Sequence, residues 1–142
     1  MTYVRNLGAR RRLTVARGSA TVEMAFLLPV FLLLVFGVFE FARAWLVLNT
    51  LNHASREAVR LAATKENLKA NDSEVIAKAQ GVAQAAGITG TAASNSSPSG
   101  SPSEVSVTTS LNYSFMTGIT LLGFSFSGTI PMNASATMRY ER

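Results

Sequence analysis

The chain has 142 residues, of which 48% are hydrophobic and 15% are charged, and it contains no cysteine. This length leaves room for one small domain, and the absence of cysteine excludes disulfides and thiolate metal sites. The formal net charge of +5 resides entirely in residues 1–18, because eight basic and eight acidic residues follow them. The basic balance therefore gives no support for nucleic-acid binding, which requires a basic face on the folded part.

The first element in chain order is a basic leader, residues 1–18, which contains five arginines and no acidic residue. An uncharged and mostly apolar run of 16 residues follows from Met24 to Phe39. Under the positive-inside rule the arginines keep the leader in the cytoplasm, so the residues after the run lie on the far side of a membrane. The sequence therefore predicts a single-pass membrane protein with a cytoplasmic N-terminus.

The predicted membrane span is longer than this run, because its residues at 1.5 Å each cover only about 24 Å of a hydrocarbon core of roughly 30 Å. We place the span at residues 19–45, with Arg43 snorkelling toward the headgroups and Trp45 in the interfacial belt. Pro29 lies inside the span. We expect a plain kink there, because neighbouring groups in membrane helices satisfy the carbonyl that a proline frees.

A short motif precedes the apolar run, where the chain reads RGSATVE from Arg17 to Glu23. It places a single carboxylate at the fifth position after Gly18, the arrangement found at the cleavage site of type IV prepilins. The stretch from Arg17 to Ala63 resembles the TadE-like pseudopilins of the tight-adherence (Tad) pilus system. The positions that carry this resemblance are Gly18, Glu23, Pro29, Gly37 to Glu40, Phe41, Arg43 and Ala54 to Arg60, with a weaker likeness from Ser135 to Glu141.

The resemblance implies that a prepilin peptidase cuts between Gly18 and Ser19, and that the helix lies in the bacterial inner membrane with residues 46–142 outside the cytoplasm. It also implies a role in pilus assembly. The implied partners are the peptidase, other pilins or pseudopilins, Tad inner-membrane assembly proteins and the lipid bilayer. Met24 stands where the major pilins of this system commonly have tyrosine, and Ser19 where many type IV pilins have phenylalanine, which favours a minor subunit.

Glu23 has two interpretations. A carboxylate in mid-span costs about 2.5–3.5 kcal/mol on insertion scales and less near the interface, so such groups usually have a partner. In one interpretation Glu23 only ends the span at the headgroups. In the other, cleavage frees an ammonium on Ser19, and Glu23 of one subunit pairs with that amine on its neighbour when the helices pack.

Two other functions are compatible with the N-terminal half. Ala42, Arg43 and Ala44 form a small-x-small site after the apolar run, and cleavage there by signal peptidase would release a secreted soluble binding domain that begins at Trp45. The chain would alternatively be an uncleaved single-span membrane protein without a pilus link.

Beyond Glu40 the apolar residues recur at three- and four-residue intervals, which predicts an amphipathic stalk. We expect one continuous helix from about Ala20 to about Glu66. Its apolar stripe consists of Ala44, Val47, Leu48, Leu51, Ala54, Ala58, Leu61 and Ala62. This stripe is expected to pack against the following domain or against neighbouring subunits.

A second helix is expected from Asn71, with Glu74 completing a capping box, to Gly87. Residues 90–103 have no periodicity and two prolines, which is typical of a flexible exposed loop. Alternation then predicts strands at 105–115 and 130–140, with Val105, Val107 and Ala134 among their inward residues. Residues 118–127 are expected to add a short strand, or to lie against the helix or the membrane surface. The expected fold class is α+β, with a small antiparallel sheet packed on the helical stalk.

The sequence contains little of the chemistry that catalysis requires. His53 is the only histidine, no paired carboxylates or phosphate-binding glycine loops occur, and no G-x-S-x-G motif is present. A catalytic triad and a histidine-based metal centre are therefore not expected, and we predict no catalytic, cofactor-binding or metal-binding residues. His53 is expected to be a solvated helix residue.

Overall fold

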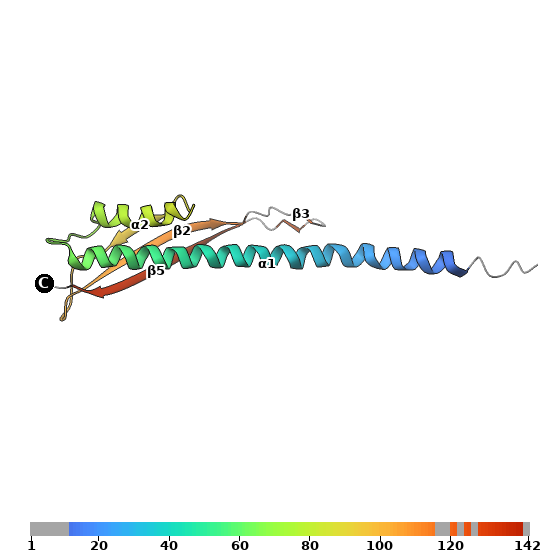
Figure 1. Cartoon of the computed structure of the whole chain (residues 1–142), viewed down its shortest axis with the longest axis horizontal. Helices are drawn as coiled ribbons and strands as arrows, with labels where there is room; N and C mark the ends of the chain where they lie inside the picture. Colours follow the sequence, from blue (N-terminus) through green and yellow to red (C-terminus); the bar gives the residue numbers. More distant parts are fainter. Residues whose placement is uncertain (1–11, 116–119, 122–123, 126–127, 141–142) are drawn as a thin grey trace, which may run out of the picture. The chain divides into compact units, whose positions relative to one another are not determined.

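The computed structural model describes residues 12–115, 120–121, 124–125 and 128–140. Two helices, α1 and α2, are followed by five strands, β1 to β5 (Figure 1). The expected α+β class is confirmed. The elements are α1 Arg12–Thr64, α2 Ser73–Ala85, β1 Ala92–Asn95, β2 Glu104–Ser114, β3 Thr120–Leu121, β4 Phe124–Ser125 and β5 Thr129–Arg139. The chain divides into two compact units, Met1–Phe39 and Glu40–Arg142, called here the N-terminal and C-terminal units.

Helix α1 begins earlier than predicted, at Arg12 in place of a residue near Ala20. Arginine, leucine and alanine are strong helix formers, so the leader residues before Gly18 continue the helix across a glycine that costs roughly 1 kcal/mol relative to alanine. The helix ends at Thr64, close to the predicted Glu66. Its last turn is tightened by a hydrogen bond from Lys65 N to Ala62 O of 3.4 Å.

Helix α2 is capped by Asp72 and not by the predicted Asn71, because Asn71 adopts a left-handed conformation with φ of 55°. The Asp72 side chain accepts a hydrogen bond of 3.1 Å from Glu74 N, which satisfies one of the free donors of the first turn. The predicted C-terminal signal is confirmed. Gly87 has φ of 78° and donates its N–H to Gln84 O at 2.8 Å.

Three strands form an antiparallel sheet in the order β1-β2-β5. Strands β2 and β5 match the two predicted strands to within one residue at each end, and they pair from Glu104↔Arg139 to Ser114↔Thr129. Strand β1 lies inside residues 90–103, so the prediction of a loop over that whole segment is wrong. Its four residues show no alternation of their own, and they become a strand by pairing with the free edge of β2.

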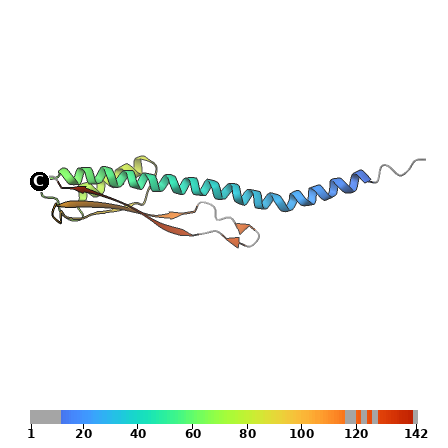
Figure 2. The same cartoon turned by 90° about the horizontal axis from the view of Figure 1, so that it is seen from below.

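The two faces of the sheet differ as alternation predicted. On β2 the side chains of Val105, Val107, Thr109 and Tyr113 are buried, while Ser106 and Thr108 on the other face are only partly covered. Strands β2 and β5 run lengthwise beside the green part of α1 in both views (Figures 1 and 2). The C-terminal unit is therefore a two-layer arrangement with helices against one face of the sheet.

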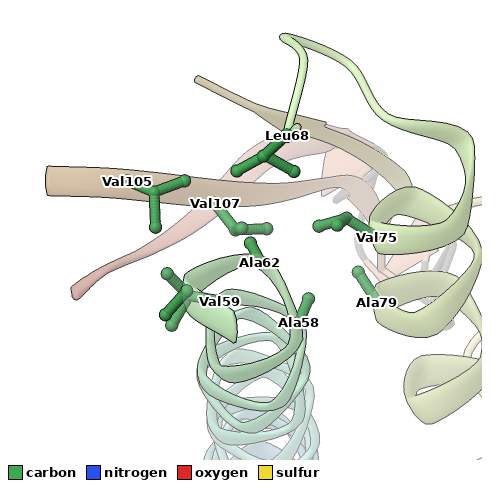
Figure 3. Close-up of a cluster of buried hydrophobic side chains, with 9 residues drawn as sticks. Ala58, Val59, Ala62, Leu68, Val75, Ala79, Val105 and Val107 are labelled. Atoms are coloured by element: carbon green, nitrogen blue, oxygen red, sulfur yellow. The ribbon is translucent and has the colours of Figure 1, made fainter. Parts of the chain in front are cut away.

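The core of the C-terminal unit consists of two clusters. The distal core joins the end of α1 to α2 and to the start of β2, and Figure 3 shows its side chains meeting from all three elements. The proximal core lies nearer to Glu40 along α1. The distal core contains Ala58, Val59, Ala62, Ala63, Leu68, Val75, Ala79, Val105 and Val107, and the proximal core contains Val47, Leu51, Tyr113 and Ala134.

Residues 118–127 contain two short strands, which agrees with one of the expected alternatives. Strands β3 and β4 pair with each other through Thr120↔Ser125 and Leu121↔Phe124. Residues 118–119, 122–123 and 126–127 lie outside the described residues. The hairpin forms a separate two-stranded sheet within the connection between β2 and β5.

Candidate membrane anchor and processing segment

The apolar run of α1 exposes its large side chains in every direction. Phe26, Phe31 and Phe39 are 76%, 62% and 69% exposed, and Leu27 and Leu34 are similarly open. A soluble protein seldom leaves such a continuous apolar surface uncovered, whereas a helix that is apolar all round suits a lipid environment. Within the described residues, this is the one helix long and apolar enough to cross a membrane, and it fits a single-pass anchor.

Pro29 lies inside this helix as expected. Figure 2 shows a bend in the blue part of α1, the part that contains Pro29. A proline removes one backbone hydrogen bond and crowds the preceding turn, which bends a helix without ending it when the flanking residues are strong helix formers. The bend agrees with the plain kink predicted from the sequence.

The predicted processing residues lie on successive turns of α1. Ser19 Oγ donates a hydrogen bond of 3.3 Å to Glu23 Oε1, and both side chains are exposed. A side chain added at Gly18 would meet no atom within 4 Å, so local packing does not require glycine there. Residues 18–23 of the motif are thus exposed on the helix surface.

A polar cluster marks the start of the C-terminal unit. Tyr113 donates its hydroxyl hydrogen to Glu40 Oε1 at 2.9 Å, and Glu40 also forms an ion pair with Arg43 at 3.6 Å. The Arg43 guanidinium lies over the Tyr113 ring, 5.3 Å from its centroid. Burial raises the pKa of Tyr113, and its hydrogen bond to Glu40 raises that pKa further. We call Glu40, Arg43 and Tyr113 the boundary cluster.

Arg43 was predicted from the sequence as an interface anchor, but its contacts with Glu40 and Tyr113 were not predicted. The available signal was the alternation of β2, which places Tyr113 on the buried face, because a buried tyrosine hydroxyl usually finds a hydrogen-bond partner. Which residue supplies that partner depends on how β2 packs against α1. Arg43, which the sequence predicts to snorkel toward the headgroups, has its guanidinium over the Tyr113 ring, and 43% of its side chain is exposed.

The other predicted interface anchor is open on the helix surface. Trp45 is 57% exposed and stacks on Phe41, with ring centroids 6.2 Å apart. An exposed indole beside an exposed phenyl ring is the arrangement expected where a helix passes through lipid headgroups.

The family model of TadE-like proteins matches residues 18–60. The chain carries a TadE-like segment. The resemblance expected from the sequence is therefore confirmed over these residues, and it supports a function related to the Tad pilus. No curated protein and no solved structure matches the chain.

The TadE-like segment begins at Gly18 and ends at Arg60, within α1. It includes Gly18 to Glu23 of the predicted processing motif, the exposed apolar run and most of the stripe that packs on the sheet. It also includes Glu40 and Arg43 of the boundary cluster. The sheet itself lies outside the match. The segment therefore combines the apolar run of the helix with the surface that packs on the sheet.

Two buried hydroxyls join α1 to the sheet inside the TadE-like segment. Thr109 Oγ1 lies 3.0 Å from Leu51 O, Ser55 Oγ lies 3.0 Å from Ala134 O, and the two hydroxyls also contact each other. Two hydroxyl protons serve these three contacts, so one hydroxyl donates to the other while the second donates to a carbonyl. The pair aligns α1 with both β2 and β5.

A second polar group holds the turn between the helices. Asn95 is 95% buried by its neighbours, being only 5% exposed. Its Oδ1 accepts from Asp72 N at 2.7 Å, and its Nδ2 donates to Lys69 O at 2.8 Å. Lys65 Nζ donates to Asp72 Oδ1 and to Glu74 Oε2, each at 2.6 Å. The hydrogen bond from Lys65 lowers the pKa of Asp72, and its bonds to Asp72 and Glu74 raise the pKa of Lys65.

The described part of the chain holds no group of three histidine, aspartate or glutamate side chains placed to bind a metal ion. His53 is exposed on α1, as the sequence predicted. The hydroxyls of Ser55 and Thr109 contact each other and backbone carbonyls, with no histidine among their partners. In the described part of the chain, these two hydroxyls join α1 to the sheet.

Proposed function

We propose that the protein is a membrane-anchored minor pilin or pseudopilin that takes part in assembly of a Tad-type pilus. In this proposal the prepilin peptidase removes residues 1–18 on the cytoplasmic side, and the C-terminal unit faces outward. The observation that carries it is the TadE-like match, which opens at Gly18 and continues through an apolar helix whose side chains are uncovered.

Gly18 lies inside α1, so cleavage after it requires the helix to open locally. Peptidases bind their substrates in an extended form, so the helix must open around Gly18 before it is cut. Glycine lowers the cost of that opening, because it stabilises a helix less than alanine by roughly 1 kcal/mol. Substituting Gly18 by alanine is therefore expected to slow cleavage while leaving the C-terminal unit folded.

Mass spectrometry of the native N-terminus tests the proposal. Protein from cells with an active prepilin peptidase should begin at Ser19, and protein from cells with an inactive peptidase should retain the leader. A start at Trp45 would support the secreted domain. Full-length protein in both strains would contradict processing after Gly18.

The pairing of Glu23 with the amine of a neighbouring subunit has its own test. Only cleavage after Gly18 creates a free ammonium near this carboxylate, and ion pairs in a low-dielectric environment are strongly favoured over an isolated charge. Glu23→Gln should be cut normally and should enter the pilus assembly poorly. Glu57→Gln is the matched control, because Glu57 lies further along the same helix in a half-exposed pair with Arg60. Equal assembly of both variants would contradict the pairing.

The boundary cluster disfavours release after Ala44. Cleavage there would remove Glu40 and Arg43 and would leave the buried Tyr113 hydroxyl without its described acceptor. A buried donor without a partner costs about 1–3 kcal/mol. A secreted domain that begins at Trp45 would lack the contacts of Glu40 and Arg43 with Tyr113.

A further inference from the structure

Strand β2 is paired to its end on one side and only in part on the other. On the β5 side the pairing reaches Ser114↔Thr129. On the β1 side it stops at Ala92↔Ser110. In the described part of the chain, no strand continues beside β2 past Ser110 on that side. Residues 111–114 of β2 therefore form an open strand edge.

The register identifies the backbone groups that lie at this edge. Ser96, which follows β1, donates its N–H to Ser106 O at 2.9 Å. In an antiparallel ladder the bonded positions alternate, so even-numbered residues of β2 direct their N–H and C=O groups to the β1 side. Asn112 and Ser114 accordingly present these groups at the open edge.

The connection from α2 to β1 explains why the edge stays open. If β1 continued in the same register, Gly90 would lie opposite Asn112 and Ile88 opposite Ser114. Gly90 instead has φ of 77°, a left-handed conformation that does not continue a strand. The N–H of Ile88 is donated to Ala83 O at 3.0 Å, at the end of α2. The connection therefore does not pair with this part of β2.

A groove of about 410 Å³ lies along the open edge. Its walls come from α1, from the turn after α2 and from residues 111–114 of β2. Leu46, Val47 and Ile88 contribute apolar surface, and Leu46 is 65% exposed. Arg43 supplies the only charge among the described lining residues. The groove thus combines unpaired strand positions, apolar side chains and one cation.

Arg43 has hydrogen-bonding capacity for a further carboxylate. Its ion pair with Glu40 is 3.6 Å long, and 43% of its side chain is exposed. A guanidinium has five N–H donors, so a single ion pair leaves donors for another acceptor. An acidic side chain on a bound chain would therefore be complementary to the charge of the groove.

We propose that an extended segment of a partner protein binds in this groove as an added strand beside residues 111–114, with an acidic residue facing Arg43. Extended peptides that join an open sheet edge gain main-chain hydrogen bonds, and pockets for alternate side chains select their sequence. Here Asn112 and Ser114 supply the main-chain groups, and the apolar wall at Leu46 receives a side chain. The groove lies within the C-terminal unit, so its occupation does not depend on processing or on the anchor.

A phage-displayed library of short random peptides, panned on the purified full-length protein in detergent micelles, provides the probe. Selected peptides should carry an acidic residue and apolar residues at alternate positions, because alternate side chains of a strand share one face. Panning on Arg43→Gln should no longer enrich acidic residues. Addition of a selected peptide should slow amide hydrogen exchange of Asn112 and Ser114 several-fold, as measured by NMR.

A matched pair of proline variants tests the strand pairing itself. Tyr140 N donates to Ser103 O, so even-numbered residues of β5 bond to β2 and the N–H of Asn133 faces away from it. Asn112→Pro and Asn133→Pro therefore each remove one N–H at an open edge and keep the hydrogen bonds between β2 and β5. Asn112→Pro should weaken peptide binding about tenfold, and Asn133→Pro should leave it within about twofold.

Three results would overturn the inference. One is a library that yields no peptide above background. Another is a selected peptide that binds without slowing exchange at Asn112 and Ser114, since the groove would then hold no added strand. The third is equal binding to wild type and to Asn112→Pro. If circular dichroism shows that Asn112→Pro does not fold, the exchange measurement on the wild-type protein decides alone. Enrichment of acidic residues on Arg43→Gln would contradict the role of Arg43.

Discussion

Phe39 and Leu51 lie on the same helix in opposite environments. Phe39 is 69% exposed, whereas Leu51 is completely buried between α1 and the sheet. Before Glu40 the apolar residues surround the helix, and after it they form a stripe with polar residues between them. A helix that is apolar all round suits lipid, and a striped helix suits a folded partner. The part of α1 before Glu40 therefore fits a membrane anchor, and the part after it packs on the sheet.

The largest expected effect is the loss of stability when an apolar side chain is shortened in the core-facing part of α1 and not in its exposed apolar run. Leu51→Ala should reduce the free energy of unfolding of the C-terminal unit by about 2–5 kcal/mol, because it leaves a cavity in the proximal core. Leu33→Ala, at an exposed position in the apolar run, should change it by less than about 0.5 kcal/mol. Denaturation in detergent micelles followed by circular dichroism measures both. Equal effects would contradict the division of α1 into a lipid-facing and a core-facing part.

A smaller loss of stability is expected at Asn95, whose side chain holds the turn between α1 and α2 by hydrogen bonds. Asn95→Ala removes the acceptor for Asp72 N and the donor to Lys69 O, both in part-buried hydrogen bonds. The loss of these bonds should reduce the free energy of unfolding by about 1 kcal/mol or more. Asn112→Ala is the control, because Asn112 is exposed on β2. The same denaturation experiment compares them. If both variants unfold alike, the turn between the helices does not depend on Asn95.

The buried hydroxyls of Ser55 and Thr109 allow a test of how the core-facing part of α1 is held on the sheet. Ser55→Ala and Thr109→Val should each reduce the free energy of unfolding by about 1 kcal/mol. The loss is modest because the hydroxyl that remains in each variant can still donate to a backbone carbonyl. The double variant should cost less than the sum, since the contact between the hydroxyls is lost only once. A double-mutant cycle measures this coupling. Strict additivity would show that the two hydroxyls act independently.

The smallest expected effect is a change in how stability depends on pH, through the ion pair of Asp72 with Lys65. The pKa of Asp72 is lowered in the folded state, so its stabilisation is present above its unfolded pKa of about 3.9 and is lost as pH falls through the folded value. Asp72→Asn keeps a good helix cap and should weaken the loss of stability in acid. Unfolding curves at several pH values compare the variant with wild type. An unchanged acid limb would contradict a stabilising Lys65–Asp72 pair.

The parts of the fold that local patterns determine were predictable. The apolar run, the stripe of the stalk and the alternation of β2 each depend on the spacing of neighbouring residues, and the structure contains all three. The start of α1 at Arg12 was not predicted, because the expected boundary relied on Gly18 and on the chemistry of a cleavage site. The helix-forming residues of the leader outweigh that single glycine.

The parts that depend on tertiary contacts were not predictable. Strand β1 forms only because β2 offers an edge, and Asp72 becomes the cap only because Asn71 turns to donate its N–H to Asn95 O. The partners of Tyr113 and Asn95 lie far away in the sequence, so alternation indicated burial without indicating what each polar group contacts. At the candidate site, the processing motif and the apolar run were found from sequence, and the boundary cluster was found only from the fold.

The measurement that tests the central claim most directly is a topology experiment on the native protein. Membranes from spheroplasts would be washed at alkaline pH and treated with an external protease, and the surviving fragments would be identified by mass spectrometry. We predict that the chain stays with the membrane, that the protease reaches the C-terminal unit, and that a fragment containing Met24 to Phe39 is protected. Recovery of the chain in the alkaline wash, or loss of that fragment, would contradict the account.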